Sequence, residues 1–185
     1  MFDHFGFLAP FYEHFIKPKS PDILSRLLNL PVDGILLDVG GGTGRVSGFL
    51  TDQVNKVIIA DLSEKMLLES LDKDGLEPVC SHAEKLPFPD AYFERVIMVD
   101  ALHHVCDQEE TAQELWRVLK PNGKIIIEEP DINSWGVKLV ALGEKIALMR
   151  SHFLAPTAVK NLYREVTNNL QIHKEGHIAW IVIHK

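Results

Sequence analysis

A glycine-rich turn and two aspartates are the residues of this chain whose types and spacing best suit ligand chemistry. Residues 36–45 read LLDVGGGTGR, in which Asp38 precedes four closely spaced glycines. Glycine lets a ligand lie directly on a backbone turn because no Cβ atom stands in the way. Asp61 ends a second apolar run, 21 positions after Gly40, and a carboxylate there can accept hydrogen bonds from both hydroxyls of a ribose. This spacing predicts a nucleoside-containing ligand; alternatively, Asp61 is a plain turn residue before a helix capped by Ser63.

The elements that would position these residues alternate between short apolar strands and helices. Residues 35–39 and 57–60 read as buried strands, and the glycine turn between them leads into a helical pattern through 46–50. The remaining pattern predicts strands at 77–81, 96–99, 170–173 and 177–183, a further strand after a turn at 120–123, and helices at 21–30, 63–71, 107–119, 131–155 and from 156 onward.

The spacing of the glycines separates two classes of nucleotide ligand. A dinucleotide site needs the motif GxGxxG; its third glycine would fall on Arg45 here, whereas the chain has Gly44. An acidic residue followed by GxGxG instead resembles the class I S-adenosylmethionine (SAM)-dependent methyltransferases, in particular the branch related to the quinone-biosynthesis methyltransferases. Two later blocks strengthen the resemblance: AEKLPFPDAYFERVIMVDALHHV at 83–105 and ELWRVLKPNGKIIIEEP at 114–130.

The resemblance implies an α/β fold, a Rossmann-like three-layer sandwich with a mostly parallel seven-stranded sheet and an antiparallel final strand. It also implies a single domain over 1–185, with an N-terminal lid and helix at 1–30 and a helical insert at 131–155 that covers the acceptor site. Both segments have simpler interpretations. Aromatic rings in the first can close an exposed edge of the core, and the apolar insert can be a scaffold helix or form a homodimer interface.

The resemblance further implies which residues bind the cofactor. Asp38 would orient the turn and the amino group of SAM, Asp61 would hold the ribose, and Leu62 would pack on the adenine. The other expected contacts are Tyr12, at the SAM carboxylate, and Gly40, Gly41, Gly42, Gly44, Met66, His82, Ala83, Glu84, Asp100 and Ala101. His82 departs from the family, which has an aspartate there to accept the adenine amino hydrogen. A neutral imidazole nitrogen or the backbone at 83–84 can take that role.

Residues at the end of the 96–99 strand are the candidates for catalysis. Methyl transfer is a direct displacement, so proximity and orientation carry much of the rate enhancement. A general base is needed only for an acceptor that is still protonated, and His103, His104 and Asp100 are the candidates. The alternative is that the two histidines hold the strand-to-helix loop. Glu129, Asp131 and His152 are weaker candidates. The chain has no CxxC spacing, and adjacent His103 and His104 would point in different directions from a regular element, so no metal site is expected.

Composition limits the partners. The chain of 185 residues has a net charge of −7 and no dense basic block, which argues against nucleic acid. Cys80 and Cys106 fit no metal spacing, and Cys80 is expected to be buried as a small hydrophobe. The first residues do not read as a signal peptide, and no apolar run is long enough to span a bilayer. A reducing cytoplasm is therefore the expected setting.

These patterns together predict a cytoplasmic enzyme that transfers a methyl group from SAM to a small molecule, hydrophobic or aromatic in character, and releases S-adenosylhomocysteine (SAH). Two other classes remain open. One is a SAM- or SAH-binding module without turnover, and the other is a nucleotide-dependent oxidoreductase, which Arg45 disfavours.

Overall fold

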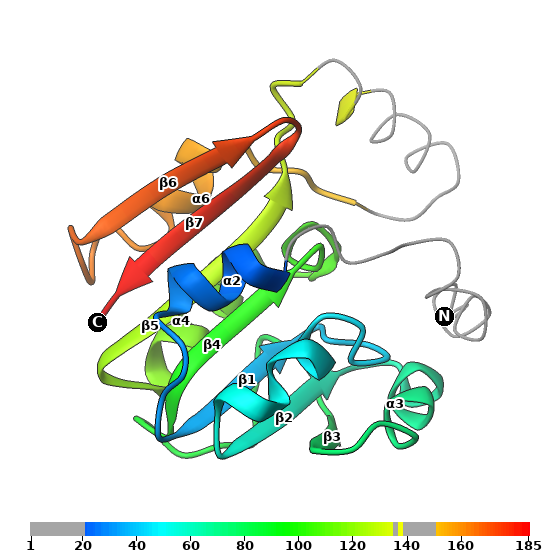
Figure 1. Ribbon diagram of the computed structural model, residues 1–185. Coiled ribbons are helices and arrows are strands. Elements are labelled where there is room, and N and C mark those ends of the chain that lie inside the picture. Colours follow the sequence, from blue (N-terminus) through cyan, green and yellow to red (C-terminus); the bar gives the residue numbers. More distant parts are fainter. Residues whose placement is uncertain (1–20, 135–136, 139–150) are drawn as a thin grey trace.

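A seven-stranded sheet runs through the middle of the molecule in the computed structural model, which describes residues 21–134, 137–138 and 151–185 (Figure 1). The strand order is β3-β2-β1-β4-β5-β7-β6. The strands are β1 (Ile35–Val39), β2 (Lys56–Asp61), β3 (Leu76–Cys80), β4 (Phe93–Val99), β5 (Leu119–Pro130), β6 (Leu170–Glu175) and β7 (Ile178–His184).

The order of the strands reverses between β1 and β4. From β1 the chain first builds outward through β2 and β3, then returns to place β4 and β5 on the other side, all in parallel. The last strand, β7, inserts antiparallel between β5 and β6. This arrangement confirms the expected fold class. Ligands of such sheets bind at the carboxyl ends of the strands where the order reverses, so a ligand site is expected at the ends of β1, β2 and β4.

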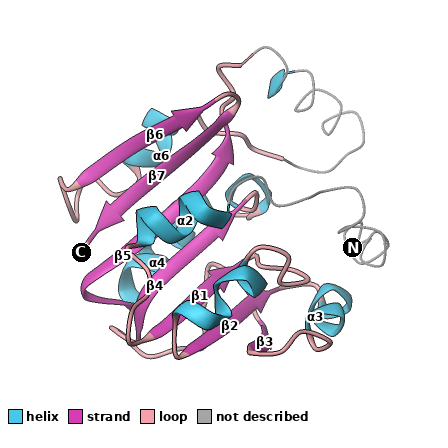
Figure 2. Cartoon of the chain, viewed as in Figure 1, coloured by secondary structure: helices cyan, strands magenta, loops and turns pink. Residues whose placement is uncertain are grey.

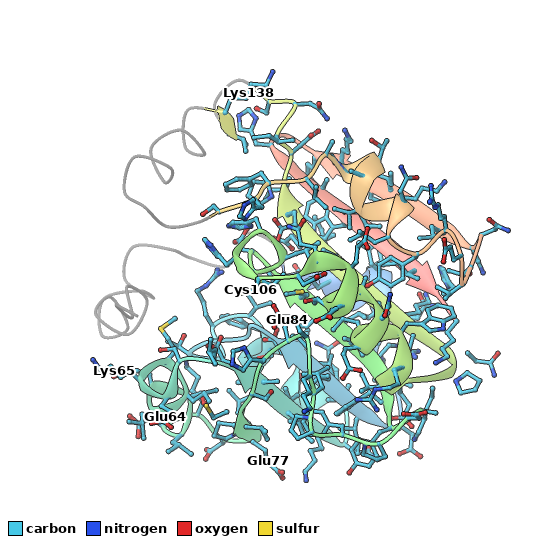
Figure 3. All side chains as sticks on the ribbon, turned by 180° about the vertical axis from the view of Figure 1, so that it is seen from behind. Glu64, Lys65, Glu77, Glu84, Cys106 and Lys138 are labelled. Atoms are coloured by element: carbon cyan, nitrogen blue, oxygen red, sulfur yellow. The ribbon has the colours of Figure 1, made fainter. Side chains whose placement is uncertain are left out.

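Helices cover both faces of the sheet (Figures 1 and 2). Helix α2 (Pro21–Leu28) and the 3-10 helix at Ser47–Gln53 lie over one face, whereas α4 (Gln108–Val118) and α6 (Pro156–Asn161) lie over the other, toward the viewer in Figure 3. Helix α3 (Glu64–Ser70) packs beside β2 and β3.

Alternation along β1 explains why two separate cores form. The neighbours Leu36 and Leu37 are both fully buried, but Leu36 packs with Leu24 and Leu28 of α2, while Leu37 packs with Leu115 of α4. Successive side chains of a strand point to opposite faces, so a strand buried on both sides is apolar throughout. The three layers follow from this pattern.

Two local features differ from the sequence-based expectation. The helical pattern after the glycine turn forms a 3-10 helix, Ser47–Gln53, rather than an α-helix. The expected turn at 120–123 lies within β5 as an irregularity, where the pairing jumps from Phe93 with Leu119 to Arg95 with Lys124. Asn122 there has a positive φ of 66°, which is the conformation that Asn and Gly favour in turns.

Cys80 is exposed, contrary to expectation. It is the last residue of β3, an edge strand of the sheet, where one side of the chain has no neighbouring strand to cover it. Cys106 is exposed as well. Within the described ranges, no helix is long and apolar enough to cross a membrane.

Candidate cofactor and active site

The glycine turn packs so tightly that side chains would not fit at its alternating positions. Gly40, Gly42 and Gly44 have positive φ values of 70°, 55° and 72°. A Cβ atom on Gly40 would lie 2.5 Å from the Cβ of Ala101, and one on Gly44 would lie 2.4 Å from a methyl group of Leu76. The turn therefore needs glycine both for its backbone conformation and for its contact with the loop after β4.

Asp61 ties the end of β2 to the glycine turn. Its Oδ2 accepts a hydrogen bond from the backbone N–H of Gly42 at 2.9 Å, and its Oδ1 accepts one from the N–H of Ser63 at 2.8 Å. An ionised carboxylate has about four acceptor positions, so these bonds fix the group and leave it capacity for ribose hydroxyls. Leu62, the next residue, is 58% exposed, which suits packing against a ligand base, whereas Met66 is buried below the turn.

Asp38 lies beneath the turn rather than on its surface. Its side chain is buried, and a Cβ atom on Gly41 would lie only 2.6 Å from its Oδ2. Burial, with a smaller contribution from the charge of Asp61, raises the pKa of Asp38 to about 7. Both protonation states are therefore populated near neutral pH, and a cationic ligand above the turn favours the ionised state.

Replacing Asp38 with asparagine should change how stability depends on pH. Asp38 has a raised pKa in the folded protein, so it binds more protons there than in the unfolded chain between about pH 4 and pH 7. Its contribution to the free energy of unfolding therefore falls as pH rises through that window and stays low above it. The Asp38→Asn variant should gain about 2–4 kcal/mol over the wild type at pH 8 and much less at pH 4.

Urea unfolding of both proteins across this pH range measures the difference directly. Other titrating groups contribute equally to the two proteins and cancel in the comparison. A difference in unfolding free energy that does not change with pH would show that Asp38 is ionised throughout.

Arg45 and Asp100 face each other across the same turn. Arg45 Nη2 lies 3.6 Å from Asp100 Oδ2, with side-chain exposures of 9% and 34%. Asp100 has a positive φ of 52°, and its N–H donates to the carbonyl oxygen of Glu128. A positive φ is uncommon for a residue other than glycine, so the sheet holds this carboxylate in a defined place at the end of β4.

Glu129 organises the loop that follows Asp100. Its Oε1 accepts hydrogen bonds from the backbone N–H groups of Ala101 at 3.1 Å and Leu102 at 2.9 Å. Its Oε2 lies 2.6 Å from Nδ1 of His103, and both side chains are almost fully buried. One carboxylate from β5 therefore fixes three consecutive residues after β4.

The segment 151–155 packs against the two histidines. The ring of Phe153 stacks on His103 at a centroid distance of 4.2 Å, and the backbone N–H of His152 donates to the carbonyl oxygen of His103 at 2.7 Å. Gln108 Nε2 joins the two segments by donating to the carbonyl oxygens of Leu102 and His152. The end of the predicted insert is thus fastened to the loop after β4.

The two histidines differ in their surroundings. Burial, together with neighbouring His103, lowers the pKa of His104 to about 3, so His104 is neutral at physiological pH and a weak base. His103 has a carboxylate partner, Glu129, which stabilises a protonated imidazole. Of the two histidines, His103 is the one whose ring lies beside a carboxylate.

Glu84 and His82 occupy the loop after β3. Glu84 Oε1 accepts hydrogen bonds from the N–H groups of Cys106 and Asp107 at the start of α4, which fastens this loop to the far side of the site (Figure 3). His82 is exposed, with its Nδ1 3.8 Å from Glu84 Oε2. Ala83 packs against the core. The side chain of Glu84 thus positions the loop by binding backbone groups.

The structure brings most of the predicted site residues to one edge of the sheet, around the carboxyl ends of β1, β2, β3 and β4. Tyr12 lies outside the described residues, as does most of the 131–155 insert. The homodimer and the absence of nucleic acid stay predictions. Among the described residues, no group of three or more His, Cys, Asp or Glu side chains could hold a metal ion.

Two residues contribute more to the site than the sequence pattern indicates. The glycine spacing marks Arg45 only as the place where a third glycine is missing, although a cation directly after Gly44 is a signal in itself. Glu129 was a minor base candidate. Its contacts with the loop depend on the pairing of β4 with β5, which no local pattern reveals.

The fold and this site agree with the sequence resemblance to the class I SAM-dependent methyltransferases. Residues 37–127 match the Methyltransferase domain family, as that resemblance predicted. This class implies SAM as the cofactor and SAH as the product. The residues fit that cofactor, because a fixed carboxylate at Asp61 and an exposed apolar side chain at Leu62 lie beside a turn in which Gly40, Gly41 and Gly42 carry no side chain.

Similar proteins include ubiquinone/menaquinone biosynthesis C-methyltransferases. That of Vibrio campbellii is 36% identical over 105 residues, which cover 51% of this chain and 40% of that protein. That of Pseudomonas fluorescens is 35% identical over 104 residues, covering 51% and 41%. The aligned part of this chain thus spans about two fifths of the length of these curated relatives.

Solved structures share the fold over nearly the whole chain. A SAM-dependent methyltransferase of Thermotoga maritima superposes with a TM-score of 0.79 at 23% identity, covering 98% of both chains. A methyltransferase of Haloferax volcanii, solved in complex with the Trm112 methyltransferase activator, also gives 0.79, at 15% identity, covering 98% of this chain and 97% of that one.

Proposed function

We propose that this chain transfers a methyl group from SAM to a small molecule with a hydrophobic or aromatic body. The observation that carries the proposal is the glycine turn with its fixed carboxylate, in which Asp61 binds Gly42 and lies at the end of β2. The similarity to C-methyltransferases of quinone biosynthesis supports an aromatic acceptor. The segments that align with these relatives cover the half of the fold that is expected to bind the cofactor. They do not cover the parts that are expected to bind the acceptor.

The charges around the turn also favour SAM over a dinucleotide. Asp38, Asp61 and Asp100 surround the turn, with Arg45 close by. SAM carries a positive sulfonium group, whereas NADH carries a negative pyrophosphate that these carboxylates repel. The local electrostatics thus agree with the glycine spacing.

The chain's own residues would orient the reactants and exclude water. SAM supplies a methyl group already activated by the positive sulfur, so alignment of the acceptor is the main task. Ala101 contacts the glycine turn and so lies where the donor's reactive end is expected. For an acceptor that attacks through a deprotonated phenol, His103 would accept the proton while Glu129 stabilises the resulting imidazolium.

Calorimetric titration with SAM, SAH and NADH tests the cofactor, and transfer of a radiolabelled methyl group to a panel of phenols and quinols tests the reaction. We expect SAM and SAH to bind at micromolar concentrations, NADH not to bind, and label to appear in an aromatic acceptor. Binding without transfer to any acceptor would favour the module without turnover. Preferential binding of NADH would overturn the proposal in favour of an oxidoreductase.

A further inference from the structure

We propose that Phe153 limits the size of the methyl acceptor, because its ring fills a flat position against the imidazole of His103 that the second ring of a larger acceptor would otherwise take. This inference rests on the proposed function, because it presumes an aromatic acceptor beside the loop after β4. It makes Phe153 a specificity-determining residue that favours phenols with a single ring over phenols with two fused rings.

The ring of Phe153 lies flat on the side chain that is the proposed proton acceptor. The centroids of Phe153 and His103 are 4.2 Å apart, and the two ring planes differ by only 15°. The ring of His104 lies 4.0 Å from the same imidazole but is tilted by 50°. His103 is 4% exposed, whereas Phe153 is half-buried. Phe153 therefore covers a face of His103 on which another planar ring could stack.

The backbone on both sides of Phe153 is anchored without help from its side chain. The N–H of His152 donates to the carbonyl oxygen of His103 at 2.7 Å, and the carbonyl oxygen of His152 accepts from Gln108 Nε2 at 2.8 Å. On the other side, Leu154 packs against the core, and α6 begins two residues further on. A substitution that shortens the side chain of Phe153 therefore leaves the segment in place and opens the space that the ring occupied.

That space lies beside the expected reaction centre. Ala101 contacts the glycine turn, where the reactive end of the donor is expected. Glu129 accepts the N–H of Ala101 and also holds Nδ1 of His103, so both residues belong to one fixed loop. An acceptor whose hydroxyl group reaches His103 must place its ring close to Phe153. The bulk of the side chain at this position therefore limits the acceptor.

The chemistry of the position suits a fused aromatic ring. Stacked aromatic pairs are more favourable than burial of the two rings alone, so a ligand ring can replace Phe153 against the imidazole. A phenol with one ring leaves Phe153 where it is, whereas a phenol with two rings needs the same space. Packed protein interiors do not yield a space of that size by compression. Discrimination against the larger acceptor therefore arises by steric exclusion.

Binding of phenol and 2-naphthol to the SAH complex tests this inference. The two probes share a planar ring with one hydroxyl group and differ by one fused ring. We would titrate both by calorimetry at saturating SAH, for the wild type, Phe153→Ala and Phe153→Leu, which keeps part of the apolar bulk. Phe49→Ala is the matched control, at an exposed phenylalanine on the 3-10 helix, over the face of the sheet opposite α4 and α6.

We expect Phe153→Ala to tighten binding of 2-naphthol by about tenfold or more, a factor that even one methylene group contributes in a hydrophobic pocket, and to change binding of phenol by less than about threefold. Phe153→Leu should show a smaller gain, and Phe49→Ala should keep the wild-type preference. The affinity for SAH should stay within about twofold in every variant, which also shows that each is folded. The ratio of kcat/KM for 2-naphthol over phenol should rise in the same order.

An unchanged ratio of the two affinities in Phe153→Ala would overturn this inference. Equal weakening of both probes would overturn it as well, because Phe153 would then be a wall that binds acceptors of either size. Absence of binding of both probes to the wild type and to Phe153→Ala would also contradict it. These results leave the proposed function standing while SAH binds and a methyl group is transferred to another acceptor. Failure of the wild type to bind SAH would instead remove the proposed function itself.

Discussion

Replacement of Glu129 with glutamine is expected to slow methyl transfer by about a hundredfold or more, the range for loss of general-base catalysis, and to weaken SAM binding by less than about threefold. The Glu129 carboxylate touches no expected position of the ligand, but it lies 2.6 Å from Nδ1 of His103 and accepts the N–H groups of Ala101 and Leu102. A neutral amide cannot stabilise an imidazolium, so proton removal from the acceptor becomes unfavourable.

The same substitution should also reduce stability. Glutamine keeps an oxygen for the N–H groups of Ala101 and Leu102 but loses the charge beside His103, and a hydrogen bond to a charged group contributes about 1.5–3 kcal/mol to the free energy of unfolding. Rates must therefore be measured well below the melting temperature, with the folded fraction checked by circular dichroism. A decrease in kcat at saturating SAM, with SAM affinity retained, distinguishes positioning of His103 from general loss of the folded state.

Glu128 provides a matched control. It is the preceding residue, it is buried to a similar extent, and its Oε2 accepts the indole N–H of Trp180 at 2.6 Å. Its side chain belongs to the opposite face of β5, away from the histidines. Glu128→Gln should therefore cost stability but leave turnover within about threefold of the wild type. Equal losses of turnover in both variants would contradict a role for Glu129 through His103.

The parts of the site that the sequence predicted are those built from neighbouring residues. The turn after β1 and the aspartate at the end of β2 lie within one strand-turn-strand unit, so spacing alone indicates that Gly42 and Asp61 meet. Apolar runs likewise marked the strands, because buried parallel strands are apolar on both faces. The local sequence therefore predicts contacts between residues that lie close together in the chain.

Contacts between distant segments could not be read in the same way. Glu129 reaches His103 because β5 pairs with β4 in a particular register, in which Val99 lies opposite Glu128. A shift of one residue would turn Glu129 to the other face of the sheet. The apolar run around Cys80 predicts a buried side chain, but Cys80 is exposed because β3 is an edge strand, which the local sequence does not reveal.

The two ends of the site are positioned by different means, and this difference bears on how it works. The expected nucleoside end rests on backbone groups held by Asp61, whereas the expected methyl-transfer end rests on a loop held by Glu129 and stacked against Phe153. Phe153 belongs to the insert expected to cover the acceptor. A change in the insert can therefore alter the loop at His103 without disturbing the nucleoside contacts.

Replacement of Asp61 with alanine is expected to weaken SAM and SAH binding by about a hundredfold. Two effects combine: the ribose loses its carboxylate, and the N–H groups of Gly42 and Ser63 lose the acceptor that fixes the turn. Each bond to a charged group is worth about 1.5–3 kcal/mol, so loss of one ribose contact alone approaches this factor.

Asp61→Asn separates the two effects. An amide oxygen still accepts one hydrogen bond, and the amide nitrogen can only donate, so the variant should retain part of the turn and show an intermediate affinity. Asp52→Ala, at an exposed aspartate on the 3-10 helix, is the control for a change in net charge and should leave binding unchanged. Calorimetric titration of the three variants with SAH would give the order Asp52→Ala, Asp61→Asn, Asp61→Ala from tightest to weakest. Wild-type affinity in Asp61→Ala would remove the ribose assignment and leave Asp61 as a residue that shapes the turn.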